Sequence, residues 1–161
     1  MHKQLAIKIK DWNQAEHTVE QWKAEGNSIV FTNGCFDILH PGHVDYLFGA
    51  KSLGDKLVIG LNSDSSVSDL KGPNRPIQDE GARAAIIAAL GCTDLIVIFN
   101  EETPLELITL LKPDVLVKGG DYKVEEIVGY QIVKGNGGKV STLDFLPGYS
   151  TSAIEKKIKS A

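Results

Sequence analysis

The chain has 161 residues, of which 42% are hydrophobic and 24% charged, and its formal net charge is −4. This length favours one domain with a sizeable core, and the negative charge excludes bulk attraction to nucleic acid or to an anionic membrane. The two cysteines, Cys35 and Cys92, form neither a metal-type pair nor a disulfide framework, and no stretch approaches the roughly 18 apolar residues of a membrane span. Since the N-terminus also has no apolar signal core, we expect a cytoplasmic protein.

Short apolar runs alternate with helical patterns along the chain. Apolar residues at helical spacing precede Gly26, which predicts a first helix over 11–25. The further predicted helices are 42–52, 79–90, 104–111, 125–134 and 150–159, and the predicted strands are 28–32, 56–61, 94–99, 114–118 and 139–143. The segment Ser63 to Gln78 is polar and rich in helix breakers, so we expect a loop there.

This alternation predicts an α/β fold. Strands that read as continuous apolar runs are typical of a parallel sheet covered by helices on both faces. Right-handed crossovers then give a Rossmann-like, doubly wound, five-stranded parallel sheet. Ligands of such folds bind beyond the carboxyl ends of the strands, where the strand order reverses. Site residues should therefore follow the strands directly.

The most informative segment is the histidine motif, residues 32–43 (TNGCFDILHPGH), which joins a predicted strand to a predicted helix. Gly34 lets the backbone approach a phosphate closely, and Pro41 is well tolerated at a first helical position. His40 and His43 then lie at the first turn, where free N–H groups and the helix dipole favour an anion. Imidazoles there donate hydrogen bonds to a phosphoryl oxygen as its charge grows. A zinc pair is disfavoured, because no third ligand has the expected spacing.

A second phosphate site is predicted at the start of the last helix. Ser150, Thr151 and Ser152 precede the apolar positions Ile154 and Ile158. Hydroxyls and free amides at a helix start form a cradle for phosphate oxygens. Serine and threonine are equally the ordinary N-cap residues of a helix, so this segment alone leaves both interpretations open.

The two motifs together resemble a known superfamily. Residues 32–43 resemble the H-x-G-H signature of the cytidylyltransferase-like nucleotidyltransferases, and residues 149–154, which we call the serine-threonine motif, resemble their second signature. Closer similarity is to the ADP-heptose synthase adenylyltransferase domain, carried by Asn62-Ser63-Asp64, Leu70-Lys71-Gly72 with Arg75-Pro76, Leu116 to Tyr122 and Gly148 to Ile158. Glu155 departs from the pattern, since an apolar residue is expected at its position.

The similarity covers residues 28–159, which we expect to be the catalytic core of a single nucleotidyltransferase domain, 1–161. Residues 1–27 would be an N-terminal helical extension. In many relatives a sugar kinase precedes this domain, and we expect the free-standing form here.

The resemblance implies that a heptose 1-phosphate attacks the α-phosphate of ATP, giving ADP-heptose and pyrophosphate for lipopolysaccharide synthesis. His40, His43 and Lys71 would be catalytic. Mg²⁺ would be carried by the nucleotide, with no direct protein ligand assigned. The nucleotide-binding residues would be Thr32, Asn33, Gly34, Cys35, Phe36, Gly42, Lys118, Gly119, Asp121, Tyr122, Ser150, Thr151 and Ser152. A homodimer is expected, with neither nucleic acid nor membrane as a partner.

Several residues have two interpretations. Lys71 and Arg75 form either a mobile clamp over the phosphates or a solvated pair. Arg83 either holds the substrate phosphate or is an exposed helical arginine. Asp37 either contributes indirectly to magnesium binding or accepts backbone N–H groups as a turn cap. Residues 118–122 either recognise the adenine or ribose or form a plain turn.

Three other activities share some of these features. A cytidylyltransferase making a CDP-alcohol such as CDP-glycerol has the same fold and both signatures. A pantetheine-phosphate adenylyltransferase also belongs to the superfamily, but the middle of the chain does not resemble it. A nucleotide-binding regulatory module without turnover would need neither histidine as a transition-state donor.

Overall fold

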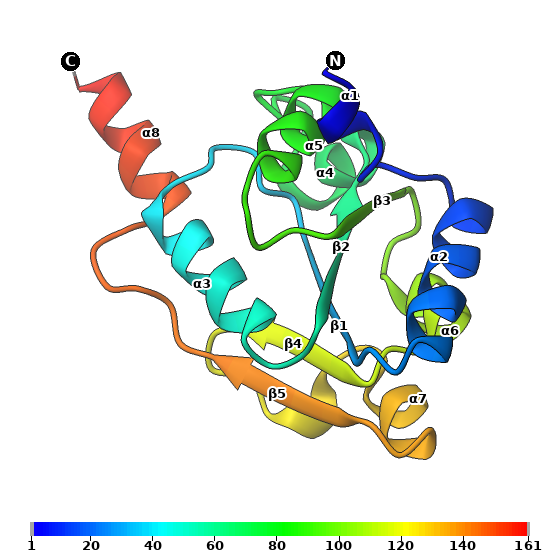
Figure 1. Ribbon diagram of the computed structural model, residues 1–161. Helices are drawn as coiled ribbons and strands as arrows, with labels where there is room; N and C mark the ends of the chain where they lie inside the picture. The colour runs from blue at the N-terminus through cyan, green and yellow to red at the C-terminus, as the bar shows by residue number, and fades with distance from the viewer. Residues whose placement is uncertain (1, 161) are drawn as a thin grey trace.

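The computed structural model describes residues 2–160 and contains a parallel sheet with helices on both faces (Figure 1). The strands are β1 (Ile29–Gly34), β2 (Lys56–Asn62), β3 (Leu95–Phe99), β4 (Val115–Gly119) and β5 (Lys139–Leu143). They form one five-stranded sheet in the order β3-β2-β1-β4-β5, with every neighbouring pair parallel. This topology confirms the predicted Rossmann-like, doubly wound fold.

Two apolar clusters fill the space between the sheet and the helices. On one face, α2 (Trp12–Ala24), α6 (Leu105–Leu111) and α7 (Tyr130–Gly135) bury residues such as Val19, Leu107 and Val133. On the other face, α3 (Pro41–Lys51) and α5 (Glu80–Ala88) bury Leu47 and Ile87. Each such side chain contributes roughly 2 kcal/mol by leaving water. The helix α3, which carries His43 in its first turn, is therefore packed firmly against the sheet.

The N-terminal segment packs onto the same sheet. The short helix α1 (Lys3–Ala6) leads to Ile9, which forms a parallel bridge with Ile96 in β3. The Ile96 N–H donates to the Lys8 carbonyl at 2.7 Å, and the Lys10 N–H donates to the Ile96 carbonyl at 3.0 Å. Residues 8–10 thus cover the outer edge of β3.

One predicted loop is partly a helix. Within Ser63 to Gln78, α4 spans Asp64–Lys71, so the prediction of a loop was wrong for these residues. The Ser63 side chain accepts a hydrogen bond from the Ser66 N–H and caps the helix start, and Val67 is fully buried. Gly72, with φ near +96°, ends the helix. The breaker-rich part is therefore limited to 72–78, and Lys71 lies in the last helical turn.

The predicted helix 125–134 is also different in the structure. A 3₁₀ turn, η1 (Val124–Glu126), is separated from α7 by Gly129, which has a φ of +92°. A Cβ at Gly129 would lie 2.7 Å from the Ile108 side chain, so close packing against α6 requires glycine there. The predicted single helix is therefore a 3₁₀ turn followed by a separate short helix.

The strand order reverses between β1 and β4, which are neighbours in the sheet although far apart in sequence. The histidine motif leaves β1 at this point, and residues 118–122 leave β4 beside it. The fold therefore brings two predicted ligand-binding segments to one crevice. Within residues 2–160, no helix has the length and apolar character needed to cross a membrane.

Candidate active site

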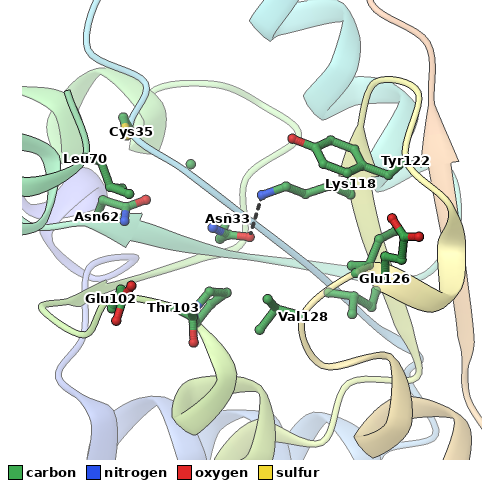
Figure 2. A pocket seen from close by; sticks show the side chains of 14 residues that line it. Asn33, Cys35, Asn62, Leu70, Glu102, Thr103, Lys118, Tyr122, Glu126 and Val128 are labelled. Carbon is green, nitrogen blue, oxygen red and sulfur yellow. Dashed lines mark hydrogen bonds between the residues drawn. The ribbon is translucent and has the colours of Figure 1, made fainter.

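The crevice at the carboxyl ends of β1 and β4 contains two adjoining pockets. The first, which we call the histidine pocket, has a volume of about 200 Å³, and its lining includes His43, Lys71, Lys118 and Thr151. The second, which we call the side pocket, has a volume of about 340 Å³, and its lining includes Asn62, Glu102, Thr103 and Glu126 (Figure 2). The two pockets share Asn33, Gly34, Cys35, Lys118 and Tyr122. They form one continuous site with two differently charged compartments.

The exit from β1 is a tight turn built around Gly34. A Cβ at Gly34 would lie 2.9 Å from the ring of Phe36, which is buried and has a φ of +47°. A left-handed conformation is uncommon for an aromatic residue and is typical of functional sites. Below the turn, the Thr32 hydroxyl is fully buried and lies 2.6 Å from the Tyr46 hydroxyl, which donates to the Val117 carbonyl. Thr32 thus supports the site from inside the core.

The two histidines stack on each other at the start of α3. The centroids of the His40 and His43 rings are 3.8 Å apart and the rings are inclined by 21°. A Cβ at Gly42 would lie 3.1 Å from two atoms of the His40 ring, so the glycine between the histidines leaves room for the stack. The His43 ring also packs edge-on against Phe36 at 5.4 Å. The spacing of the motif therefore sets the geometry of the pair.

Both imidazoles are held in their neutral form. Burial lowers the pKa of His40, while burial together with the neighbouring His40 and Lys71 lowers the pKa of His43 to about 4. Within residues 2–160, the Nδ1 atoms of both histidines are buried and have no hydrogen-bond partner. Orphaned buried polar atoms are rare in folded proteins. Both Nδ1 atoms can therefore form a hydrogen bond with a bound ligand.

Asp37 fixes the breaker-rich loop beside the histidines. Its buried carboxylate accepts hydrogen bonds from the backbone N–H groups of Ile77 and Gln78, each at 2.9 Å, and pairs with the Arg75 guanidinium. Burial raises the pKa of Asp37, but these donors outweigh it and hold the pKa below its usual value. The geometry favours the turn-anchoring interpretation of Asp37 over a role at a metal ion.

Arg75 does not extend into the histidine pocket. Its guanidinium lies between two carboxylates, those of Asp37 and Glu155, and its side chain is 14% exposed. Lys71 and Arg75, which were expected to form one clamp, therefore lie in different places. Lys71 lines the histidine pocket, and Arg75 pairs behind it.

Arg83 lies inside the protein and not on its surface. Its guanidinium donates to the carbonyls of Gln78, Cys35 and Asn62 and pairs with the Asp64 carboxylate at 2.7 Å. The side chain is fully buried, so the alternative of an exposed arginine was wrong, and a substrate phosphate has no access to it in this conformation. Arg83 instead ties the ends of β1 and β2 to the start of α5.

Lys118 stands at the junction of the two pockets. Its ammonium donates to the Asn33 side-chain oxygen at 3.4 Å, as Figure 2 shows, and burial lowers its pKa. Gly119, the next residue, packs under Phe145, since a Cβ there would lie 2.5 Å from that ring. Tyr122 lines both pockets, whereas Asp121 is exposed and outside the lining of either. Of the site residues predicted within 118–122, Lys118, Gly119 and Tyr122 line the crevice and Asp121 does not.

The serine-threonine motif begins α8 (Thr151–Lys159). The Ser150 side chain accepts from the Ala153 N–H at 3.1 Å, so it is the N-cap of the helix. Thr151 lines the histidine pocket, and Ser152 is exposed outside it. Figure 1 shows α8 projecting from the body of the protein at the end of the chain. The helix start, with its free N–H groups, thus faces the same pocket as His43 and Lys71.

The lining of the crevice includes residues that the sequence prediction of the site lacked, among them Asn62, Glu102, Glu126 and Phe145. Asn62 ends β2 and Glu102 follows β3, so their place after a strand was the available signal. Phe145 follows β5 and gave no such signal, because its role depends on packing over Gly119. Within the described part of the chain, no group of three or more His, Cys, Asp or Glu side chains is arranged to hold a metal ion.

The sequence matches the family model described as Cytidylyltransferase-like over residues 31–157. It is 59% identical over 140 residues to the Bifunctional protein HldE of Rhodopseudomonas palustris and 53% identical over 154 residues to that of Caulobacter vibrioides. These matches cover 87% and 96% of this chain but 28% and 32% of the relatives, so the chain spans about a third of their length.

Two solved structures have a similar fold. A lipopolysaccharide core biosynthesis protein from Thermoplasma volcanium is 32% identical, with a TM-score of 0.60 over 75% of this chain and 98% of that one. A pantoate-beta-alanine ligase from Francisella tularensis is 16% identical, with a TM-score of 0.57 over 94% of this chain and 76% of that one. The second similarity concerns the fold alone.

Proposed function

We propose, because this chain belongs to the cytidylyltransferase-like family, that it is an adenylyltransferase that joins AMP from ATP to a heptose 1-phosphate, giving ADP-heptose and pyrophosphate. The observation that carries the proposal is the histidine pocket. It combines the neutral imidazole of His43, two lysines and a helix start at the point where the strand order reverses. His40 stacks on His43 but lines a separate pocket, with Pro41 and Phe48. The similarity to the bifunctional relatives and to a lipopolysaccharide core biosynthesis protein supports the sugar substrate.

The proposed chemistry needs charge stabilisation more than proton transfer. An oxygen of the sugar phosphate attacks the α-phosphorus of ATP and forms the new P–O bond. The bond from that phosphorus to the bridging oxygen breaks, and pyrophosphate leaves with the electron pair. Since the nucleophile is already an anion, no strong general base is required, and positioning and electrostatics supply the rate.

The residues of the histidine pocket suit this task. The lowered pKa of His43, about 4, leaves it neutral near pH 7, so one ring nitrogen carries a proton to donate to an α-phosphate oxygen. His40, stacked on it, would contact the leaving bridging oxygen. Lys71 and Lys118 approach from α4 and β4 and would neutralise the phosphates from two sides. Thr151 and the amides that begin α8 would hold the β- and γ-phosphates.

The side pocket has the opposite electrostatic character. The carboxylates of Glu102 and Glu126 line it, together with the amides of Asn33 and Asn62 (Figure 2). Carboxylates repel a polyphosphate but accept hydrogen bonds from hydroxyl groups. We assign this pocket to the sugar, with its phosphate at Lys118, where the two pockets meet.

Magnesium would be held by the nucleotide and not by the protein alone. The Asp37 carboxylate is already paired, and the described residues contain no ligand cluster for a metal ion. Mg²⁺ commonly keeps several waters and binds through substrate phosphates. When bound, it would supply further charge neutralisation on the triphosphate. The cytoplasmic location and the homodimer also stay predictions.

A panel of assays tests the proposal. Pyrophosphate release is measured with ATP or CTP against heptose 1-phosphate, glycerol 3-phosphate and pantetheine phosphate, in the presence of magnesium. We expect turnover with ATP and heptose 1-phosphate. Preference for CTP with glycerol 3-phosphate would identify a CDP-alcohol-forming enzyme. Tight nucleotide binding without turnover in any combination would identify a regulatory module.

A further inference from the structure

Glu155, at a position where the resemblance predicts an apolar residue, has a specific partner in the structure. Its carboxylate pairs with the Arg75 guanidinium, whose other side pairs with Asp37. The side chains of Asp37, Arg75 and Glu155 are 1%, 14% and 29% exposed, so the chain of charges runs from the interior to the edge of the protein. Partly buried pairs of this kind are screened less than surface ion pairs.

These three residues connect the two phosphate-binding motifs. Asp37 belongs to the histidine motif, between Phe36 and His40. Glu155 lies one helical turn after Thr151, on the same side of α8, and Thr151 lines the histidine pocket. Arg75 therefore joins the loop that follows β1 to the first turns of α8.

Little else holds α8 against the body of the protein. The helix contains no fully buried residue, and Ile158 in its last turn is 67% exposed. By contrast, α3 buries Tyr46, Leu47 and Ala50 against the sheet. Since only Thr151, Ile154 and Glu155 of this helix are partly buried, its place depends strongly on a few contacts, among them the pair of Glu155 with Arg75.

We propose that Glu155 is a positioning residue that acts through Arg75 and holds the start of α8 at the histidine pocket. The proposal rests on the proposed function in one respect, that the start of α8 receives the triphosphate. It assigns to Glu155 the alignment of Thr151 and the free amides with phosphates bound in the ground state. An uncharged residue at position 155 would leave the serine-threonine motif unchanged in sequence, but Thr151 and the free amides would no longer be held in place for the phosphates.

The principal test combines amide hydrogen exchange with steady-state kinetics on Glu155→Gln. In the variant, we expect amides of 151–159 to exchange about fivefold faster and the KM for ATP to rise about fivefold, as loss of a partly buried ion pair predicts. Amides of α3 should exchange as in the wild type, and kcat should change less than twofold. Glu155→Asp keeps the charge and should restore both values in large part. Lys159→Gln removes a charge from the exposed end of the same helix and serves as the matched control.

A double-mutant cycle identifies Arg75 as the link. Once Arg75 is replaced by alanine, the further change Glu155→Gln should have no additional effect on exchange in α8. Unchanged exchange and KM in Glu155→Gln, or additive effects in the cycle, would overturn the proposal. The exchange measurement and the binding of a non-hydrolysable ATP analogue need no turnover. Failure of the heptose assay would therefore count against the proposed function and not against the role of Glu155.

Discussion

The histidine motif and the serine-threonine motif of this protein are held in different ways. The histidine motif passes from β1, in the centre of the sheet, into α3, and its turn is packed around Phe36, Gly34 and Tyr46. The serine-threonine motif begins a helix with no buried residue, joined to the body through Arg75 and Glu155. Apolar packing and the buried pairs of Asp37 fix the first motif, whereas the second depends on the Arg75–Glu155 pair and on a few partly buried side chains. One cradle is thus preorganised, while the other can adjust to its ligand.

The largest expected effect concerns the preorganised motif. Replacing His43 by alanine should lower kcat by about 100-fold or more and leave ATP binding largely intact, because a transition-state donor is lost. Steady-state kinetics together with calorimetric binding of an ATP analogue measure the two quantities. An unchanged kcat would remove His43 from the mechanism, and the contrast between the motifs would then have no catalytic meaning.

The next effect concerns how firmly the first motif is anchored. Asp37→Asn should lower the free energy of unfolding by about 2–3 kcal/mol, because it leaves Arg75 and the loop N–H groups without a buried anionic partner. Glu155→Gln should cost about 1 kcal/mol or less, since its pair is more exposed. Urea unfolding of both variants compares the two ends of the same ion chain. Equal losses would remove the proposed difference between the motifs.

The pH dependence of stability tests the burial of His43 in the first motif, with an effect comparable to that of Asp37→Asn at the acid end of the range. The pKa of His43 is lowered from 6.5 to about 4 in the folded protein, so the unfolded chain binds the proton more tightly. The contribution of neutral His43 to the free energy of unfolding is therefore fully present above pH 6.5 and is lost as the pH decreases toward 4. In His43→Gln this loss should be shallower over the same range, measured by urea unfolding at several pH values. Parallel curves for variant and wild type would contradict the buried, neutral state of His43.

The smallest effect is that of salt. Raising the ionic strength from about 0.05 M to 0.5 M shortens the screening length severalfold and should speed amide exchange in α8 by about twofold. Amides in α3 should not respond, because apolar packing holds that helix. Exchange measured in the same samples provides the internal control. An equal response of both helices would show that charge does not distinguish them.

The sequence predicted the strands and the first motif because both depend on local patterns. Apolar runs such as Leu57 to Leu61 identify buried strands. The spacing of His40, Gly42 and His43 places the two imidazoles side by side with room for the stack. The helix α4 was missed because the breakers at 72–76 dominated the segment, although Ser63 was a usable cap signal.

The remaining differences depend on contacts between distant segments. The role of Arg83 is set by carbonyls of Cys35, Asn62 and Gln78, which no spacing along α5 indicates. Likewise, Glu102 and Glu126 lie in two short Glu-Glu pairs far apart in sequence, and only the strand order brings them to one pocket. Sequence patterns report local structure well, but they do not report which charges a fold will pair.

The bridge between Ile9 and Ile96 has a consequence for self-association. An uncovered edge strand offers a row of N–H and C=O groups on which another chain can form an added strand, a common route to aggregation. Residues 8–10 pair with this edge of β3 at Ile96, through both its N–H and its C=O. Within residues 2–160, the opposite edge strand, β5, pairs with β4 alone, and it begins with the exposed Lys139 and continues through Ser141 and Thr142. At the edge of β3, the N-terminal segment pairs with Ile96 and hinders an added strand there. At the edge of β5, charge and polarity discourage one.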